Sequence, residues 1–179
     1  MAENGLTTVN RLLVEREVLL VCGPGGVGKT TTAASLAVRA AIDGRRVLVI
    51  TVDPARRLAD ALGLEGDGRV EVPGSGVLDS VMVDTRRGWD DLVRRLAPDD
   101  EAAEALIADP LFRNLTDRFA RSHDYLALDA VYEHHLSGEY DLIVVDTPPA
   151  RHALDVIDAP DRMREFFASR LARLLTSPG

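Results

Sequence analysis

The sequence predicts an α/β fold, in which helices cover both faces of a mainly parallel β-sheet. Three observations favour this fold. Four mainly apolar segments have the length of strands, at residues 18–22, 47–52, 78–83 and 142–145. Between these runs, apolar side chains recur at helical spacing. A glycine-rich loop joins the first run to the first helix, and an alternation of strands and helices is typical of a parallel sheet.

The composition predicts one globular domain and excludes several partner classes. Hydrophobic residues make up 46% of the 179 residues, which suffices for a real core. The net charge of −8 argues against a nucleic-acid partner and against a polybasic membrane anchor. No apolar run approaches the ~20 residues of a membrane-spanning segment. Because Cys22 is the only cysteine, we expect no disulfide and a cytoplasmic location.

The loop after the first apolar run fits the phosphate-binding pattern G-x-x-x-x-G-K-S/T. Such a loop directs backbone N–H groups and a helix N-terminus at a polyphosphate, which predicts a polyphosphate ligand and a P-loop NTPase fold. Lys29 would reach the β and γ phosphates, and Thr30 would bind the Mg²⁺ that bridges them. The predicted nucleotide-binding residues are Gly23, Pro24, Gly25, Gly26, Val27, Gly28, Lys29, Thr30 and Thr31.

Lys29 is also singled out by composition. Of the 21 basic side chains, twenty are arginines and one is this lysine. The planar fork of arginine cannot replace a compact ammonium inside a phosphate-binding loop. In a chain whose other basic residues are all arginines, we therefore expect a lysine at the position that binds phosphate, which is Lys29.

The first part of the chain predicts a helix and a strand around this loop. Residues 1–16 could form one or two helical turns that begin near residues 7 and 8. Residues 18–22 are apolar throughout, which predicts the central strand, buried on both faces of the sheet. Residues 30–43 have helical periodicity, and Gly44 is placed to end that helix.

The second strand, at residues 47–52, runs into Asp53 and Pro54, which leaves a carboxylate at the carboxyl edge of the sheet. Residues 58–62 predict a short helix, and the glycine-rich stretch that follows predicts at most a short edge strand near residues 70–72. Residues 78–83 predict the third strand.

Two later regions predict helices. From about residue 89 to residue 137 the apolar spacing indicates several short helices and no strand, which predicts a helical insertion within the single domain. Residues 160–175 have the apolar stripe of one further helix.

The fourth strand, at residues 142–145, runs directly into Asp146. Four apolar residues followed by an aspartate form the Walker B pattern, whose acid holds Mg²⁺ directly or through water. Asp146 and Thr30 are therefore the predicted metal-binding residues.

The same glycines also fit the dinucleotide pattern G-x-G-x-x-G, with Asp53 near the place of a ribose-binding acid. That pattern gives no reason for Lys29 and Thr30 directly after Gly28, nor for a second acid at the end of a strand. The features of the sequence favour the P-loop interpretation.

These motifs resemble the ArsA-like family of anion-transporting and tail-anchored-protein-targeting ATPases. This family lies in the dimer-forming class of P-loop NTPases that also includes the MinD and ParA proteins. The resemblance covers nearly the whole chain, and it is carried by the phosphate loop, two switch segments and the segment before the fourth strand, at residues 23–31, 53–58, 146–152 and 137–141.

The resemblance implies a magnesium-dependent ATPase that couples its nucleotide state to the conformation of a dimer and of the helical insertion. Lys29 and Asp53 would be catalytic, with Asp53 positioning the attacking water. The implied switch residues are Asp53, Pro54, Asp146, Pro148 and Arg151. The partner would be a second copy or a related ATPase subunit, and the cargo an unidentified protein or anion.

Two residues depart from the family pattern. Pro24 occupies the position of a family lysine that reaches across the dimer, and Arg151 that of a switch glycine. Loss of the lysine leaves open a regulatory ATP-binding subunit with little hydrolysis, and a MinD- or ParA-like positioning ATPase is the other alternative. A single cysteine cannot form the thiolate cluster that arsenite requires.

The domain is also predicted to be incomplete at its C-terminal end. A P-loop domain of this kind needs a further strand whose loop contacts the nucleotide base, and residues 148–179 contain no strand-like run.

Overall fold

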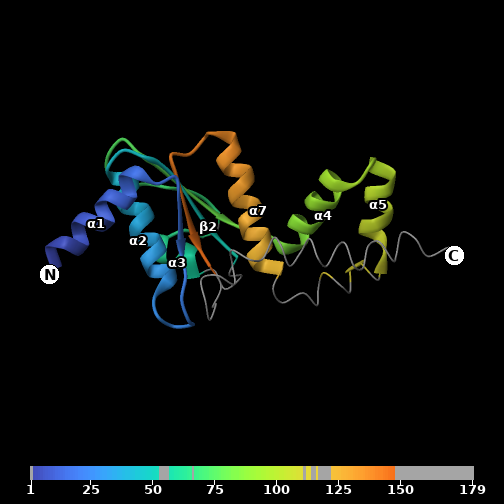
Figure 1. Ribbon diagram of the computed structural model, residues 1–179, viewed down its shortest axis with the longest axis horizontal. Helices are drawn as coiled ribbons and strands as arrows, with labels where there is room; N and C mark the ends of the chain where they lie inside the picture. Colours follow the sequence, from blue (N-terminus) through green and yellow to red (C-terminus); the bar gives the residue numbers. More distant parts are fainter. Residues whose placement is uncertain are drawn as a thin grey trace.

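The computed structural model describes residues 2–52, 57–65, 67–110, 112–113, 116 and 122–147 (Figure 1). Helices and strands alternate through most of this length. In chain order they are α1 (Ala2–Glu15), β1 (Val18–Val21), α2 (Lys29–Ile42), β2 (Arg46–Thr51), α3 (Arg57–Leu62), β3 (Gly68–Val70), β4 (Val77–Met82), α4 (Thr85–Leu96), α5 (Asp100–Ala108), α7 (Ser122–Ser137) and β5 (Leu142–Asp146).

The described strands form a five-stranded sheet in the order β1-β5-β2-β4-β3. Strands β1, β5, β2 and β4 are parallel to their neighbours, and β3 pairs antiparallel to β4. The predicted mainly parallel sheet is therefore confirmed. The expected short edge strand exists, but it lies at Gly68–Val70 rather than near residues 70–72.

The predicted central position of the first strand is wrong for the sheet that the described residues form. β2 is the middle strand, and β1 lies at an edge and is only half-buried along its length. The reason is that β5, the last strand in the chain, enters the sheet between β1 and β2. An apolar run indicates burial, but it contains no information on which strand a distant segment will pair with.

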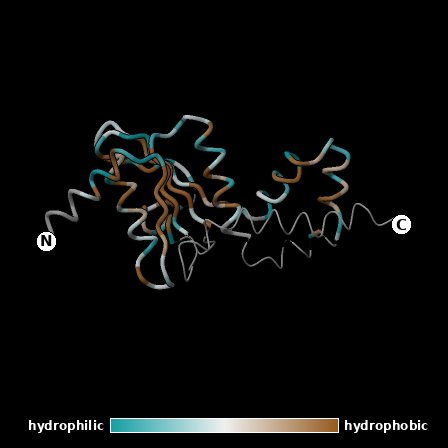
Figure 2. The backbone as a smooth tube through the Cα atoms, in the orientation of Figure 1, coloured by the Kyte–Doolittle hydropathy of each residue, from teal (hydrophilic) through white to brown (hydrophobic). Residues whose placement is uncertain are grey.

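Helices cover both faces of the sheet, as predicted. On one face, α1, α2 and α3 pack on the odd-numbered residues of β2 and the even-numbered residues of β5. On the other face, α7 packs on the alternate residues of the same strands. Figure 2 shows the resulting apolar centre, with the strands hydrophobic and the outer surfaces of the helices mixed. The fully buried β2 side chains are Val47, Leu48, Val49 and Ile50.

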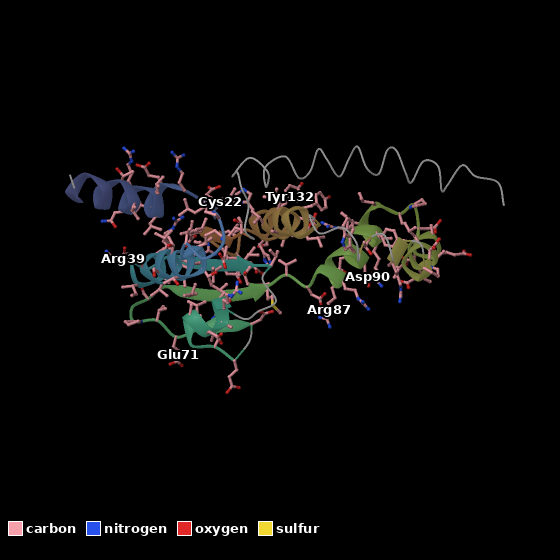
Figure 3. All side chains as sticks on the ribbon, turned by 90° about the horizontal axis from the view of Figure 1, so that it is seen from below. Cys22, Arg39, Glu71, Arg87, Asp90 and Tyr132 are labelled. Carbon is pink, nitrogen blue, oxygen red and sulfur yellow. The ribbon has the colours of Figure 1, made fainter. Side chains whose placement is uncertain are left out.

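The predicted helical region after β4 forms a separate apolar cluster. Trp89 and Leu92 of α4, Ile107 of α5 and Leu126 of α7 are all buried in it, and Trp89 stacks on Tyr125 at 6.3 Å between ring centroids. Because α7 also packs on the sheet, one helix joins both cores. Figure 3 shows Arg87 and Asp90 of α4 well apart from Arg39 of α2.

The end of α2 follows the sequence prediction. Gly44 has φ 97°, and its N–H donates to the carbonyl of Ala41, while the N–H of Arg45 donates to that of Ala40. This is a Schellman motif, which requires a residue tolerant of positive φ. α1, in contrast, begins at Ala2 and is longer than the predicted one or two turns.

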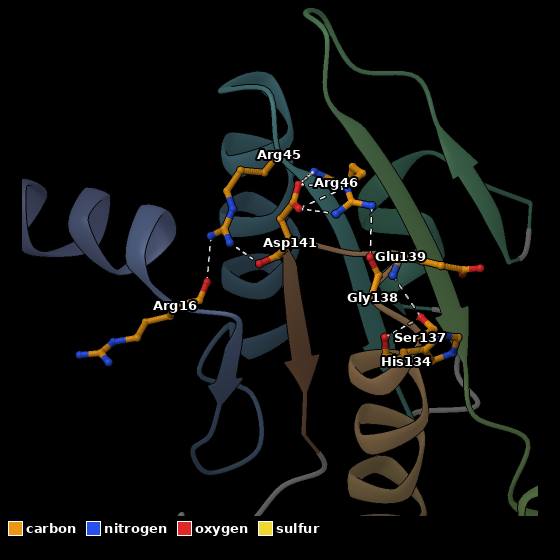
Figure 4. Close-up of polar contacts among 8 residues, drawn as sticks. All are labelled: Arg16, Arg45, Arg46, His134, Ser137, Gly138, Glu139 and Asp141. Carbon is orange, nitrogen blue, oxygen red and sulfur yellow. Dashed lines mark hydrogen bonds and ion pairs between the residues drawn. The ribbon is translucent and has the colours of Figure 1, made fainter.

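An arginine-rich junction joins the amino ends of β2 and β5 (Figure 4). The Arg45 guanidinium donates to the backbone carbonyls of Leu13, Arg16 and Asp141. Arg46 donates through its backbone N–H and its guanidinium to the Asp141 carboxylate, at 2.9 Å and 2.6 Å. The Arg46 hydrogen bonds hold the pKa of Asp141 below its usual value. The segment at residues 137–141 therefore has a structural role, at the edge opposite the phosphate loop.

Candidate nucleotide-binding site

The carboxyl ends of three strands meet in a single row of the sheet. Val21 of β1 pairs with Asp146 of β5, which in turn pairs with Thr51 of β2. The phosphate loop leaves the sheet one residue after Val21. Because ligands of parallel α/β sheets bind at this edge, the row is the base of the candidate site.

Because side chains alternate along a strand, Asp146 lies on the face of the sheet that α2 covers. Leu142 and Val144 of β5 pack toward α2, so Asp146, two residues further on, projects from the same face. Thr51 follows Val47 and Val49 on that face of β2 in the same way. The N-terminus of α2, with Lys29 and Thr30, lies over this face. Asp146 and Thr51 are almost fully buried, at 3% and 4% exposure.

Three glycines of the phosphate loop have positive φ angles. Gly23, Gly26 and Gly28 have φ values of 155°, 79° and 89°. Gly28 is the N-cap of α2, and its carbonyl accepts from the Thr32 N–H and from Thr32 Oγ1, both at 2.9 Å. Residues with side chains rarely adopt these φ values, so substitution at Gly26 or Gly28 would strain the loop.

Lys29 lies across the loop that it follows. Its Nζ donates to the carbonyl of Pro24 at 3.1 Å. The ammonium is thus held close to the backbone of the loop. Thr30, the next residue, is half-buried in the first turn of α2.

Two threonines that the sequence did not single out also lie in the site. Thr51 Oγ1 donates to Asp146 Oδ2 at 3.4 Å. Thr147 donates to the carbonyl of Val21 twice, through Oγ1 at 2.9 Å and through its backbone N–H at 3.4 Å. A hydroxyl at the end of an apolar strand is the signal that could have identified Thr51.

The structure brings together only part of the predicted site. The residues Gly23 to Thr31 form the loop and first turn of α2, and Asp146 lies at the end of β5 beside them. Asp53, Pro54, Pro148 and Arg151, and the predicted helix at residues 160–175, lie outside the described residues.

The glycine loop and the buried acid agree with the comparison to known families. Residues 16–176 match the model of the anion-transporting ATPase family, ArsA ATPase. This chain belongs to the ArsA ATPase family. The match covers the described strands from β1 to β5 and both switch segments.

Several known proteins are similar to this chain over most of its length. An uncharacterised protein of Streptomyces coelicolor is 38% identical over 154 residues, which cover 82% of this chain and 37% of that protein. ATPase GET3 of Mycosarcoma maydis is 31% identical over 160 residues, covering 88% of this chain and 47% of the relative. ATPase GET3 of Paracoccidioides lutzii is 30% identical over 183 residues, covering 99% and 53%. The chain thus spans about half the length of these relatives, or less.

Within the part of the chain that the structure describes, no helix is long and apolar enough to cross a membrane.

Proposed function

We propose that this chain is a magnesium-dependent ATPase domain that binds ATP on the loop between β1 and α2. The observation that carries the proposal is the strand register, which aligns Val21, Asp146 and Thr51 and so brings a buried carboxylate to the edge and face where α2 begins. A buried carboxylate is costly unless it is hydrogen-bonded or near a cation. Its place here fits a site for a cation and a polyphosphate.

The side chains of the described site have separate tasks in this proposal. Backbone N–H groups of the glycine loop would hold the β-phosphate, and Lys29 would exchange the Pro24 carbonyl for phosphate oxygens. Thr30 and Asp146 would hold Mg²⁺, whose oxygen-ligand preference matches a hydroxyl and a carboxylate. A Mg²⁺ held there by Thr30 and Asp146 would supply positive charge that neutralises the phosphates.

The attacking water would be positioned by Asp53, which follows β2 in the chain by two residues. Resemblance to the family supports this role. Hydrolysis then needs the carboxylate to accept a hydrogen bond from the water in line with the γ-phosphorus.

The proposal includes a dimer, with a second copy or a related subunit, whose conformation depends on the nucleotide. The dimer itself is proposed from the resemblance to the family. Coupling to the helical insertion is supported by α7, which packs against the sheet through Val131 and against the helical cluster through Leu126. The cargo class, an anion or a protein, is proposed from the family description alone. A cytoplasmic location is proposed from the single thiol.

A regulatory subunit with little hydrolysis is the second candidate, and Pro24 favours it. A dimer of this chain would lack the lysine that reaches the partner's nucleotide in the resembled family. Binding and turnover must therefore be measured separately.

The test is to measure binding of a fluorescent, non-hydrolysable ATP analogue with and without Mg²⁺, and phosphate release from ATP. We expect binding that Mg²⁺ strengthens, and loss of that strengthening in Asp146→Asn. Binding without phosphate release would favour the regulatory subunit. Absence of binding in the unsubstituted chain would contradict the proposed function.

A further inference from the structure

Thr51 ends β2 beside the Walker B acid, and its hydroxyl donates a hydrogen bond to that acid. The distance from Thr51 Oγ1 to Asp146 Oδ2 is 3.4 Å, and both side chains are buried. We propose that Thr51 is a positioning residue for Asp146, which sets the orientation of the carboxylate toward the metal held at Thr30. This inference rests on the proposed nucleotide site.

The Asp146 carboxylate has two torsions about which it can rotate, and the strand fixes neither of them. A hydrogen bond to one oxygen restricts both. The acceptor is a carboxylate and both groups are buried, and a hydrogen bond out of water is electrostatically stronger than the same bond at the surface. Thr51 is therefore suited to hold Asp146 in one rotamer before any metal binds.

The hydroxyl is itself held by the sheet rather than by a loop. The carbonyl of Thr51 accepts from the N–H of Val83 at 2.8 Å, and Thr51 pairs with Met82 on one side and with Asp146 on the other. A β-branched residue has few χ1 choices in a strand. The donor therefore has a fixed place from which to orient its acceptor.

Thr147 complements this arrangement without contacting the carboxylate. Its hydroxyl and backbone N–H both donate to the carbonyl of Val21, the last residue of β1. This fixes the backbone after Asp146 against the strand that leads into the phosphate loop. Thr147 thus anchors the backbone of the acid, while Thr51 anchors its side chain.

The experiment substitutes Thr51→Val, which keeps the shape and removes the hydroxyl. Affinity for the non-hydrolysable ATP analogue is measured in EDTA and across a Mg²⁺ titration, and free Mn²⁺ is measured by electron paramagnetic resonance in the same mixtures. We expect unchanged affinity in EDTA and about a tenfold loss of metal affinity, the lower end for removal of a group that orients a metal ligand.

Two variants provide controls. Thr51→Ser restores the hydroxyl and should restore metal affinity to within about threefold. Ser80→Ala removes another buried hydroxyl, which is 3% exposed and lies on β4, away from Asp146. This variant should leave metal affinity unchanged. In an Asp146→Asn background, Thr51→Val should cause little further loss, because the two groups act as one unit.

Metal affinity in Thr51→Val within twofold of the unsubstituted chain would overturn the inference. Equal losses of nucleotide affinity in EDTA and in Mg²⁺, or failure of Thr51→Val to fold, would also overturn it. So would losses of metal affinity that add to those of Asp146→Asn, or failure of Thr51→Ser to restore metal affinity. In all these cases the unsubstituted chain would still bind nucleotide, and the proposed function would stand. If the unsubstituted chain binds no nucleotide, both proposals fail.

Discussion

Lys29 has a place that a longer, forked side chain cannot take. Its Nζ reaches back to the carbonyl of Pro24 at 3.1 Å, and its aliphatic stem lies 3.8 Å from where a side chain on Gly23 would begin. The loop is therefore closed around a narrow stem and a compact ammonium. The single lysine in a chain of arginines is explained by this geometry.

Substitution of Lys29 tests this explanation. Lys29→Ala should weaken ATP binding by at least ~100-fold, or about 2.7 kcal/mol, because the ammonium's bonds to phosphate are lost. Lys29→Arg should be nearly as weak, because the fork does not fit the loop. Calorimetric titration measures both. Arg39→Ala, at the far end of α2 where Arg39 pairs with Asp43, is the matched loss of one charge and should bind normally. Near-normal affinity of Lys29→Arg would contradict the geometric explanation.

A second residue prediction concerns Asp53. Asp53→Asn should keep ATP binding and lose at least ~10² in turnover, the scale of a positioned base. The same calorimetric titration and a phosphate-release assay separate the two effects. Loss of binding instead would show that Asp53 has a structural role.

At the scale of elements, the C-terminal end of α2 packs closely against the segment that leads into β4. A Cβ built on Gly76 would lie 2.0 Å from the carbonyl oxygen of Ala41. That oxygen belongs to the backbone of the helix end that Gly44 stops, so it cannot move without opening the Schellman motif. Gly76 is required for close contact between a helix and the start of a strand.

Gly76→Ala should therefore destabilise the fold by roughly 1–3 kcal/mol, the usual cost of overpacking, or more. Urea unfolding measures the change. Gly88→Ala on α4 is the control, because its Cβ would meet only the end of the Leu126 side chain at 3.0 Å, and alanine favours a helix. Equal losses in the two variants would contradict the close-approach explanation.

The Arg46–Asp141 junction predicts a pH dependence at the opposite edge of the sheet. Hydrogen bonds from Arg46 hold the pKa of Asp141 below its ordinary value, so the carboxylate stabilises the folded state above the unfolded pKa of about 3.9. That contribution is lost as the pH falls through the folded pKa. Asp141→Asn should lower the melting temperature at pH 7, and its deficit should shrink below about pH 4. A deficit that is constant with pH would show that Asp141 does not titrate in this way.

The described residues of the molecule form three apolar clusters, one on each face of the sheet and one among the helices, and α7 packs in two of them. Arg95 of α4 forms ion pairs with Asp129 and Glu133 on that helix, so the helical cluster is tied to α7 by charge as well as by packing. The nucleotide site lies at the end of the sheet core. We expect a nucleotide-dependent movement of the helical cluster to act through α7 and these ion pairs.

At the scale of the whole molecule, the prediction concerns turnover in a dimer that has proline at position 24. If turnover in a dimer is limited by a missing trans-acting cation, Pro24→Lys should raise phosphate release, by up to ~10³ for a cation on the transferring phosphoryl group. Pro24→Ala is the control for loss of the proline ring alone. If Pro24→Lys gives no rise while Arg151→Ala lowers turnover, an arginine already supplies the charge.

The local sequence pattern was sufficient to predict those parts of the structure that depend on residues close together in the chain. The glycine loop, Lys29, the ends of α2 and the four parallel strands could be predicted, because backbone conformation and apolar periodicity are properties of short segments. The length of α1 was underestimated because its first turns are polar, and a sequence alone gives little sign of a polar helix.

Strand order and the contacts across the row could not be predicted in this way. Residues 18–22 and 142–145 are similar apolar runs, yet only the paired structure decides that β5 separates β1 from β2. Thr51 and Asp146 are 95 residues apart in the chain, and they meet because of that pairing. The sequence by itself determined which residues are proposed to hold a phosphate and a metal. The tertiary structure decided which hydroxyl orients the acid, because hydrogen bonds between strands depend on long-range register.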